Sequence, residues 1–446
     1  MEQSLAEHLE HISQLWHRGL EHAGFDAVWL AAGSESMHFQ DDHGPAFKAN
    51  PYFTQWVDPA FAHAGAHLFL SPGEKPQLFL LKPTDYWHAT TPIPEYLQSV
   101  VDINVFSSSQ SLLQACGAKS RVQNRYAYIG QDQGNENLGV PNDPRLLDFM
   151  AFHRGVKTNY ELENMRNASE IGVHGHIAAA EEFRRHGSEF DIHMAYLSAS
   201  GQTENQLPYA NIVALNEHGA TLHYQRQDRD AAKEPRSLLI DAGGNYRGYA
   251  SDITRTYCAS GPHHEEFRSL LGLMQDHQDT IIEEVRSGIS YAYLHRFMHE
   301  QLAQVLFDAS LIHCSAQEAF ALGVTEKFCP HGLGHLLGIQ VHDVGGHLAD
   351  EQGRTEPPPD NYPSLRTTRT IEPDQVFTIE PGLYFINSLL EALAEQHAPI
   401  NWDIVNRLRD YGGIRIEDNV RVLEHGVENL TRDAWTRIAT SGTDAR

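Results

Sequence analysis

The chain has 446 residues, of which 41% are hydrophobic and 21% charged, a balance that excludes fibrous and disordered proteins. This length exceeds one ordinary domain and predicts two. The formal net charge of −26 excludes nucleic acid as a partner and adhesion to anionic membranes, because phosphates would be repelled, but it is compatible with metal cations.

No run of the sequence is long and apolar enough to span a bilayer. The polar opening segment also lacks the basic and apolar regions of a secretory signal. The four cysteines are scattered without a CxxC pair, which indicates reduced thiols rather than a zinc or redox motif. We therefore expect a soluble protein of the cytoplasm.

The first half of the chain predicts a mixed α/β domain over residues 1–155. Apolar residues at helical spacing predict a first helix near residues 5–20. Short apolar runs broken by Gly, Pro or Ser then predict strands. These runs are FDAVWLAAG, AHLFLSPG, PQLFLLK, VDINVF and RYAYIG.

A second domain is predicted over residues 156–446. Thr158 followed by Glu161 forms a capping-box signature that leads into a long helix, so the boundary is placed just before it. Farther along, the segment GGHLADEQGRTEPPPDNYPS is too rich in Gly, Pro and Asp for regular structure and predicts a surface loop.

Two carboxylates are brought together by a predicted hairpin, SLLIDAGGNYRGYASDITRTY. Asp241 ends its first apolar run. Asp252 is expected within the returning strand, on the same side as Thr254 and Thr256. Because Asp is common beside turns, this hairpin alone leaves a purely structural role open.

A histidine-rich loop follows in the segment FCPHGLGHLLGIQVHDVGGH, which holds His331, His335, His342 and His347 among glycines. A neutral imidazole is the commonest transition-metal ligand, and histidines also supply donors to a developing oxyanion. The loop therefore predicts a ligand site, with solvent-facing histidines as the alternative.

Glu380 in QVFTIEPGLYF and Glu417 in GGIRIEDNVRV are acids in otherwise apolar strand-like runs. Strand alternation places each on the face opposite its neighbouring isoleucines. A buried acid is costly unless it is paired or metal-bound, so each requires a partner, for which Arg415 is an alternative to a metal.

Four carboxylates and one histidine form an oxygen-rich set suited to two divalent first-row ions. Mn²⁺ fits the hardness of these ligands best, and Co²⁺ or Zn²⁺ are alternatives. The set consists of Asp241, Asp252, His335, Glu380 and Glu417.

The motifs DAGG…SDITRT, HGLGH, TIEPG and RIEDNV, in this order, resemble those of the pita-bread metallopeptidases. That group includes methionine aminopeptidase, aminopeptidase P and prolidase. The chain most resembles the bacterial Xaa-Pro dipeptidases, a group that includes organophosphorus acid anhydrolases. The resemblance implies an α+β protein in which an N-terminal creatinase-like α/β domain precedes a C-terminal pita-bread catalytic domain.

The resemblance also implies roles for individual residues. The five ligands would hold two Mn²⁺ per subunit, with Asp252 and Glu417 bridging, and Glu380 would shuttle a proton to the leaving nitrogen. Groups that steady the substrate and oxyanion or orient the ligands would be His223, His331, His342, Arg415 and Tyr209. For each non-ligand a purely structural role stays open.

The implied activity is hydrolysis of dipeptides that end in proline. Arg366 in YPSLRTTR resembles the arginine with which prolidases bind the free C-terminal carboxylate. Asp42 and Trp87, in the first domain, resemble residues that reach into the active site, Trp87 across a homodimer interface.

Three alternatives are weighed. Aminopeptidase P acts on longer Xaa-Pro peptides, but Arg366 and the helical insertion at residues 386–407 argue against it. Hydrolysis of organophosphate triesters and phosphofluoridates is expected as a side activity. A non-catalytic binding module on the same fold would have lost metal ligands, and none is missing here.

Overall fold

The computed structural model describes residues 2–82, 86, 92–120, 125–131 and 137–441. The chain divides into two compact units. The first comprises Met1–Arg154, Thr158–Glu161 and Leu348–Thr355, and the second comprises Gly155–Lys157, Leu162–His347 and Glu356–Arg446. No helix in the described part of the chain combines the length and apolar character needed to cross a membrane.

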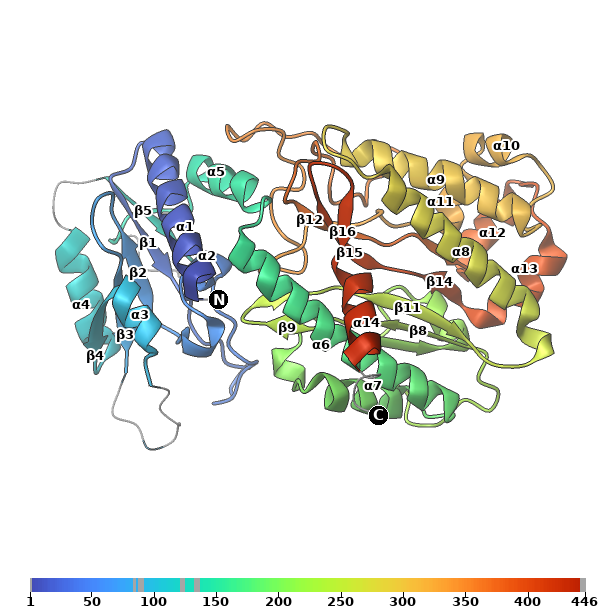
Figure 1. Ribbon diagram of the computed structural model, residues 1–446, viewed down its shortest axis with the longest axis horizontal. Helices are drawn as coiled ribbons and strands as arrows, with labels where there is room; N and C mark the ends of the chain where they lie inside the picture. Colours follow the sequence, from blue (N-terminus) through green and yellow to red (C-terminus); the bar gives the residue numbers. More distant parts are fainter. Residues whose placement is uncertain (1, 83–85, 87–91, 121–124, 132–136, 442–446) are drawn as a thin grey trace. The chain divides into compact units, whose positions relative to one another are not determined.

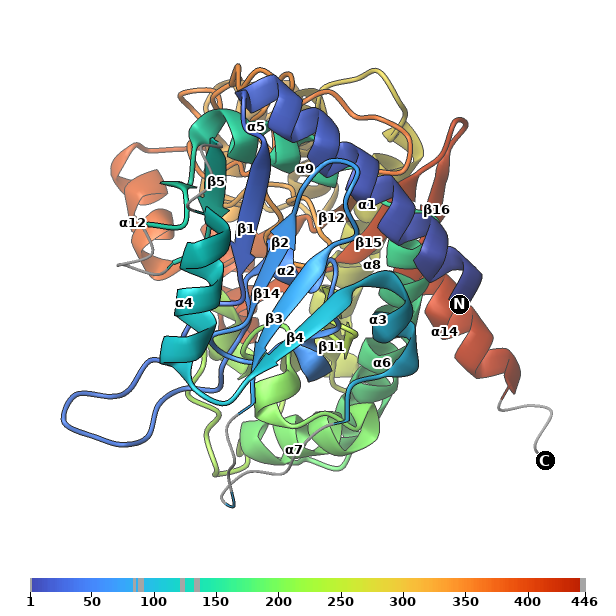
Figure 2. The same cartoon turned by 90° about the vertical axis from the view of Figure 1, so that its left-hand side faces the viewer.

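A mixed six-stranded sheet forms the centre of the first unit (Figure 2). Its order is β4 (Asp102–Phe106), β3 (Gln77–Leu81), β2 (His67–Leu70), β1 (Ala27–Ala31), β5 (Tyr126–Ile129) and β6 (Val140–Pro141). Strand β2 is antiparallel to both of its neighbours, whereas β3–β4, β1–β5 and β5–β6 are parallel. The five strands predicted for this half are confirmed.

Helices cover both faces of this sheet because side chains alternate along its strands. Val28 and Leu30 of β1 pack in one core with α1, and Trp29 packs in a second core with α4. The predicted first helix is confirmed, with Trp16 and Leu20 fully buried. The helical elements of this unit are α1 (Glu2–Ala23), α2 (Pro51–Thr54), η1 (Pro59–Phe61), α3 (Glu95–Val100), α4 (Ser109–Ser120) and α5 (Pro144–Arg154).

Helix α6 (Asn159–Arg184) begins at the predicted capping box. The backbone N–H of Thr158 donates to Glu161 Oε2 over 2.9 Å, and the N–H of Glu161 donates to Thr158 Oγ1 over 3.4 Å. Each side chain thus satisfies a backbone donor that the first helical turn leaves unpaired.

The second unit contains short sheets and a helical layer. Its sheets have the orders β11-β8-β7, β12-β15-β16, β13-β14 and β10-β9. The strands are β7 (Ile212–Leu215), β8 (Ser237–Asp241), β9 (Asn245–Tyr246), β10 (Tyr249–Ala250), β11 (Thr254–Cys258), β12 (Val376–Ile379), β13 (Gly382–Tyr384), β14 (Gly413–Arg415), β15 (Asp418–Val422) and β16 (Val427–Asn429).

Helices α8 and α9 run side by side over the main core of this unit (Figure 1). Their buried apolar residues pack with those of β12, β14 and β15. Besides α6, the helical elements are α7 (Glu189–Ser200), η2 (Glu204–Gln206), η3 (Asn216–Ala220), η4 (Pro262–His264), α8 (Glu265–Glu284), α9 (Tyr291–Asp308), α10 (Ala316–Ala321), α11 (Val324–Phe328), α12 (Asn387–Glu395), α13 (Trp402–Leu408), η5 (Arg409–Tyr411) and α14 (Leu430–Ser441).

The predicted hairpin is present, because β8 and β11 pair antiparallel with Asp241 opposite Thr254. One detail of that prediction is wrong: Asp252 lies two residues before β11, since the short β9–β10 pair is inserted at the tip. The Gly- and Pro-rich segment at residues 345–364 has no helix or strand, as predicted.

Candidate metal centre

Four acidic side chains of the predicted set lie where strands of the second unit end. Asp241 is the last residue of β8, and Asp252 precedes β11. Glu380 and Glu417 were expected within strands, but each lies just outside one, after β12 and between β14 and β15. Their backbone N–H groups bond across to other segments, to the carbonyls of Leu333 and of Thr254 over 2.9 and 3.0 Å.

These strand ends bring the predicted ligands together. Asp252, His335 and Glu417 each offer an oxygen or nitrogen atom, and all three atoms lie within 4.8 Å of one another. The Nε2 atom of His335 is 3.4 Å from Asp252 Oδ2 and 3.8 Å from Glu380 Oε1. A donor set of this composition suits a divalent first-row cation.

Asp241 provides an independent test of that fit. Its Oδ2 accepts a hydrogen bond from Arg415 Nη2 over 2.8 Å, whereas its Oδ1 is buried and has no hydrogen-bond partner in the described part of the chain. Because a buried carboxylate oxygen is costly to leave unpaired, this atom is available to a cation.

His335 has the orientation that a metal ligand requires. Its Nδ1 lies 3.0 Å from the carbonyl oxygen of Leu336, so that nitrogen carries the proton and donates it. Nε2 then faces Asp252 and Glu380, where a bound cation would take the place of its proton. Fixing the tautomer through the second ring nitrogen is the usual arrangement at metal-bound histidines.

The buried acids repel one another. Burial and the charge of Asp252 raise the pKa of Asp241 to about 6. Burial also raises the pKa of Glu380 to about 7, and with the charge of Asp252 it raises the pKa of Glu417 well above its ordinary value. Burial acts the same way on Asp252, but the hydrogen bond and charge of His335 outweigh it and lower that pKa. A bound cation would keep all four acids ionised.

Arg415 fixes two of these acids. Besides bonding Asp241, its Nε donates to Thr254 Oγ1 over 3.1 Å, and that hydroxyl donates to Glu417 Oε2 over 2.7 Å. Its Nη1 donates to the hydroxyl of Tyr384 over 2.9 Å. Arg415 therefore reaches Glu417 through Thr254 and orients the acid set without replacing a cation.

Tyr384 also determines which ring nitrogen of His331 carries the proton. Since the Tyr384 hydroxyl accepts from Arg415, its proton points to His331 Nε2, 2.9 Å away. The Nδ1 of His331 then donates to the carbonyl of Gly332 over 2.8 Å. Tyr384 was not among the predicted site residues. The one indication of it in the sequence is that its hydroxyl is a polar group within the apolar run that follows Glu380.

Three predicted substrate groups lie at the exposed edge of the site. The rings of His342 and His335 are 4.4 Å apart. Burial lowers the pKa of His342 to about 4, and the charges of His335 and Arg366 add to this effect. His223 acts electrostatically on both His342 and His331. The side chains of His223, His342 and Arg366 are exposed to solvent.

Tyr209 lies beside the acids of the second unit. The buried Tyr209 hydroxyl makes no hydrogen bond of good geometry with the described residues, but it lies close to the carboxylates of Asp241 and Asp252. Burial and the charges of these two acids raise its pKa well above the ordinary value. Asp42 is an exposed residue of the first unit. Trp87 lies outside the described residues.

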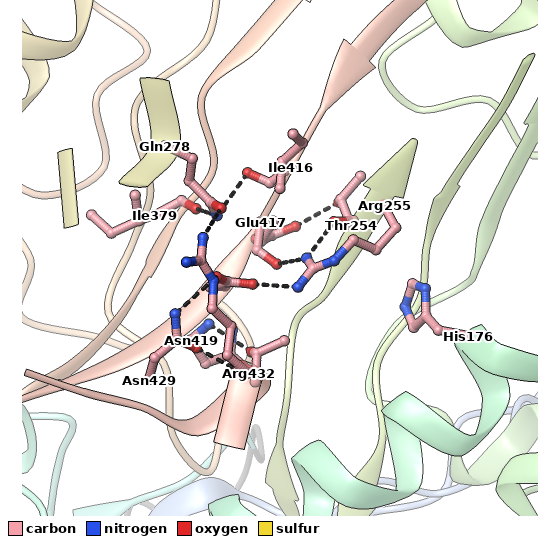
Figure 3. Close-up of polar contacts among 12 residues, drawn as sticks. His176, Thr254, Arg255, Gln278, Ile379, Ile416, Glu417, Asn419, Asn429 and Arg432 are labelled. Atoms are coloured by element: carbon pink, nitrogen blue, oxygen red, sulfur yellow. Dashed lines mark hydrogen bonds and ion pairs between the residues drawn. The ribbon is translucent and has the colours of Figure 1, made fainter. Parts of the chain in front are cut away.

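Behind the ligands is a polar network that the sequence analysis did not identify (Figure 3). The buried Asp418 accepts from Arg255 Nη2 over 2.6 Å and from Arg432 Nε over 2.7 Å. Asn419 Oδ1 accepts from the backbone N–H of Asp252 over 3.0 Å. In the sequence, the only nearby indication of these contacts is the pair of polar residues that follows Glu417.

A second group of possible ligands, Glu189, His218 and Asp228, also lies within 4.8 Å. Here both oxygens of Glu189 are occupied. Oε1 accepts from the Leu215 N–H and His218 Nδ1 over 2.9 and 2.7 Å, and Oε2 from the Tyr224 hydroxyl and the Asp228 N–H, each over 2.8 Å. This cluster is a hydrogen-bonded hub.

Comparison with known proteins identifies similar chains. Residues 3–152 match the model of the Xaa-Pro dipeptidase N-terminal domain, and residues 163–424 match that of metallopeptidase family M24. A curated Xaa-Pro dipeptidase of Pseudoalteromonas atlantica is 43% identical over 445 residues, which cover 97% of this chain and 99% of that protein. One from Aeromonas hydrophila is 42% identical over 440 residues, with 97% and 98% covered.

Solved structures share the fold at lower identity. Proline aminopeptidase P II from Yersinia pestis has a TM-score of 0.72 and 22% identity, with 97% of each chain covered. Aminopeptidase P from E. coli with the inhibitor Pro-Leu has a TM-score of 0.73 and 22% identity, with 95% of each covered. With the two family models, these matches confirm the predicted order of an N-terminal α/β domain and a C-terminal metallopeptidase domain.

Proposed function

Because this chain belongs to metallopeptidase family M24, we propose that it is a metal-dependent dipeptidase that hydrolyses the bond before a C-terminal proline. The curated relatives named Xaa-Pro dipeptidase support the substrate class, since they align over nearly the whole chain. The observation that carries the proposal is the convergence of buried acids around His335 Nε2, with one carboxylate oxygen of Asp241 left unpaired.

The metal would be held by residues of the second unit alone. We assign two divalent ions, Mn²⁺ by ligand hardness with Co²⁺ or Zn²⁺ as substitutes. When bound, such ions lower the pKa of a water and polarise the scissile carbonyl. The ligands would be Asp241, Asp252, His335, Glu380 and Glu417.

The chain itself supplies proton transfer and substrate contacts. Glu380 keeps 16% of its side chain exposed, so it is accessible to the leaving imide nitrogen, which must be protonated to depart. His342 and His223, at the exposed edge, would donate to the oxyanion and substrate. His331 has its Nε2 lone pair occupied by Tyr384 and would support this edge as a neutral ring.

Arg366 would bind the free carboxylate of the dipeptide. It lies near enough to His342 for its charge to lower the pKa of that ring. Its guanidinium is exposed and offers paired donors that match a carboxylate. We further propose that the chain acts in the cytoplasm as a homodimer.

A three-substrate assay tests the proposal. The Mn²⁺-loaded protein is incubated with a Xaa-Pro dipeptide, a Xaa-Pro tripeptide and a phosphofluoridate, and kcat/KM is measured for each. We expect the dipeptide to be the preferred substrate, with the phosphofluoridate a side reaction. Preference for the tripeptide would indicate an aminopeptidase, and dipeptide hydrolysis that survives exhaustive chelation would contradict the metal assignment.

A further inference from the structure

Gln278 of helix α8 joins the backbone segments that carry two of the acids. Its side chain is completely buried. Its Nε2 donates to the carbonyl of Ile379 over 3.0 Å and to that of Ile416 over 3.1 Å (Figure 3). Each of these carbonyls belongs to the residue immediately before an acid, Glu380 in one segment and Glu417 in the other.

The two carbonyls lie at a break in the strand pairing. Strands β12 and β15 pair up to Ile379 opposite Asp418, and pairing resumes between β13 and β14 at Gly382 opposite Arg415. Pro381, in the gap, has no N–H to donate. The backbone joins the two segments in this gap by one long hydrogen bond, from the Ile416 N–H to the Pro381 carbonyl over 3.4 Å. Gln278 adds two shorter side-chain bonds there, so it helps to hold the two segments together at the acids.

Chemistry allows only one orientation of the Gln278 amide. Its Oε1 accepts from Arg432 Nη2 over 2.8 Å, and a guanidinium can only donate. The carbonyls on the other side can only accept, so the NH₂ group must face them. Arg432 is itself held by the buried Asp418, which follows Glu417 in sequence.

We propose that Gln278 is a positioning residue that fixes the separation of the Glu380 and Glu417 carboxylates and thereby the affinity of the site for divalent ions. This inference rests on the proposed function, in which those two acids are metal ligands. Groups behind the ligands commonly change metal affinity 10- to 100-fold when they are replaced, because they set the ligand geometry.

The test measures Mn²⁺ binding by calorimetry and the melting temperature with and without Mn²⁺. Gln278→Glu places a carboxylate against both carbonyls, and Gln278→Met removes the donors at similar size. Gln304→Glu is the matched control, because Gln304 is an exposed residue of α9 that donates to Asp308. We expect a Kd for Mn²⁺ at least about tenfold higher in both Gln278 variants and within about twofold of wild type in the control.

The melting temperatures separate positioning from packing. A positioning role predicts that Mn²⁺ raises the melting temperature of the variants less than that of wild type. An unchanged Kd in a folded Gln278 variant would overturn the proposal, as would two variants that stay unfolded even in saturating Mn²⁺. The titration needs no substrate, so tight Mn²⁺ binding by a wild-type chain that cleaves no Xaa-Pro peptide would reject the dipeptidase assignment alone.

Discussion

At the scale of single residues, the candidate site depends on hydrogen bonds that leave particular atoms free. His335 donates from Nδ1 and so presents Nε2. Asp241 is bonded through one oxygen and leaves the other unpaired. The hydroxyl of Tyr384 accepts from Arg415 and donates to His331. His335 and Asp241 are therefore oriented before an ion arrives, which limits the cost of ordering the site on binding.

The choice between dipeptides and longer peptides is predicted to depend on Arg366. Replacing it with Met removes paired, charge-assisted hydrogen bonds to the substrate carboxylate. Such bonds contribute about 1.5–3 kcal/mol, so KM for a Xaa-Pro dipeptide should rise roughly 10- to 100-fold with little change in kcat. Steady-state kinetics on the Mn²⁺-loaded variant provides the measurement.

A C-terminally amidated Xaa-Pro substrate serves as the internal control. It lacks the carboxylate, so wild type and Arg366→Met should process it with similar kcat/KM. An equal loss on the acid and the amide would instead assign Arg366 to the structure of its loop.

At the scale of elements, helix α7 organises the loop that carries His223. Its first residue, Glu189, binds the backbone N–H groups of Leu215 and Asp228, which bound that loop. It also accepts from the Tyr224 hydroxyl, next to His223. One buried carboxylate thus holds both ends and the middle of this segment, which includes the short helix η3.

Replacing Glu189 with Ala is predicted to destabilise the protein strongly. The buried N–H of Leu215 and the partly buried N–H of Asp228 would lose their partners, at about 1–3 kcal/mol for a buried group, so we expect the free energy of unfolding to fall by about 3 kcal/mol. Urea denaturation measures this. Asp191→Ala, which removes the capping acid two residues later, should cost only about 1 kcal/mol. Equal effects of the two changes would contradict the role given to Glu189.

At the scale of the whole molecule, the chain concentrates unfavourable charge at one place. Its net charge is −26, and four acids lie close together in the second unit. Burial raises the pKa values of Asp241, Glu380 and Glu417, so the metal-free fold disfavours the ionised forms of these three acids. Cation binding and folding are therefore coupled through the same groups.

Metal removal is predicted to lower the melting temperature by a larger amount as the pH rises. Glu380 and Asp241 have pKa values raised to about 7 and about 6, mainly by burial, whereas an unfolded chain releases these protons near pH 4. Between about pH 4 and 7 the metal-free native state holds the extra protons, so its stability falls as the pH rises. Mn²⁺ displaces them, so the melting-temperature difference between Mn²⁺-loaded and chelated protein should grow across this window.

Comparing the Mn²⁺-loaded and the chelated protein at each pH removes the opposing effect of buried histidines on stability. Burial lowers the pKa of His277 and of His299 to about 3, so both stay neutral in the fold and cost stability as the pH falls below about 6.5. They act equally with and without metal and cancel in the comparison. A melting-temperature difference that is independent of pH would contradict the prediction.

The sequence by itself determined the features that depend on near neighbours. Short apolar runs bounded by Gly, Pro or Ser were sufficient to predict the strands of the first unit, and the pair Thr158 and Glu161 was sufficient for the start of α6. The order of four motifs indicated the five ligands, and the structure places those residues close together. The sequence also predicted that Glu380 and Glu417 point away from their neighbouring isoleucines. It did not predict that both residues lie just outside strands.

Only the tertiary structure decided the surroundings of these ligands. Gln278 is separated by 138 residues from the carbonyl of Ile416 that it binds, and Arg415 by 174 residues from Asp241. Periodicity and local motifs report on contacts within an element or a turn, so they carry no information on such distant pairings. The tautomer of His335, the unpaired oxygen of Asp241 and the break in the strand pairing all follow from three-dimensional neighbours.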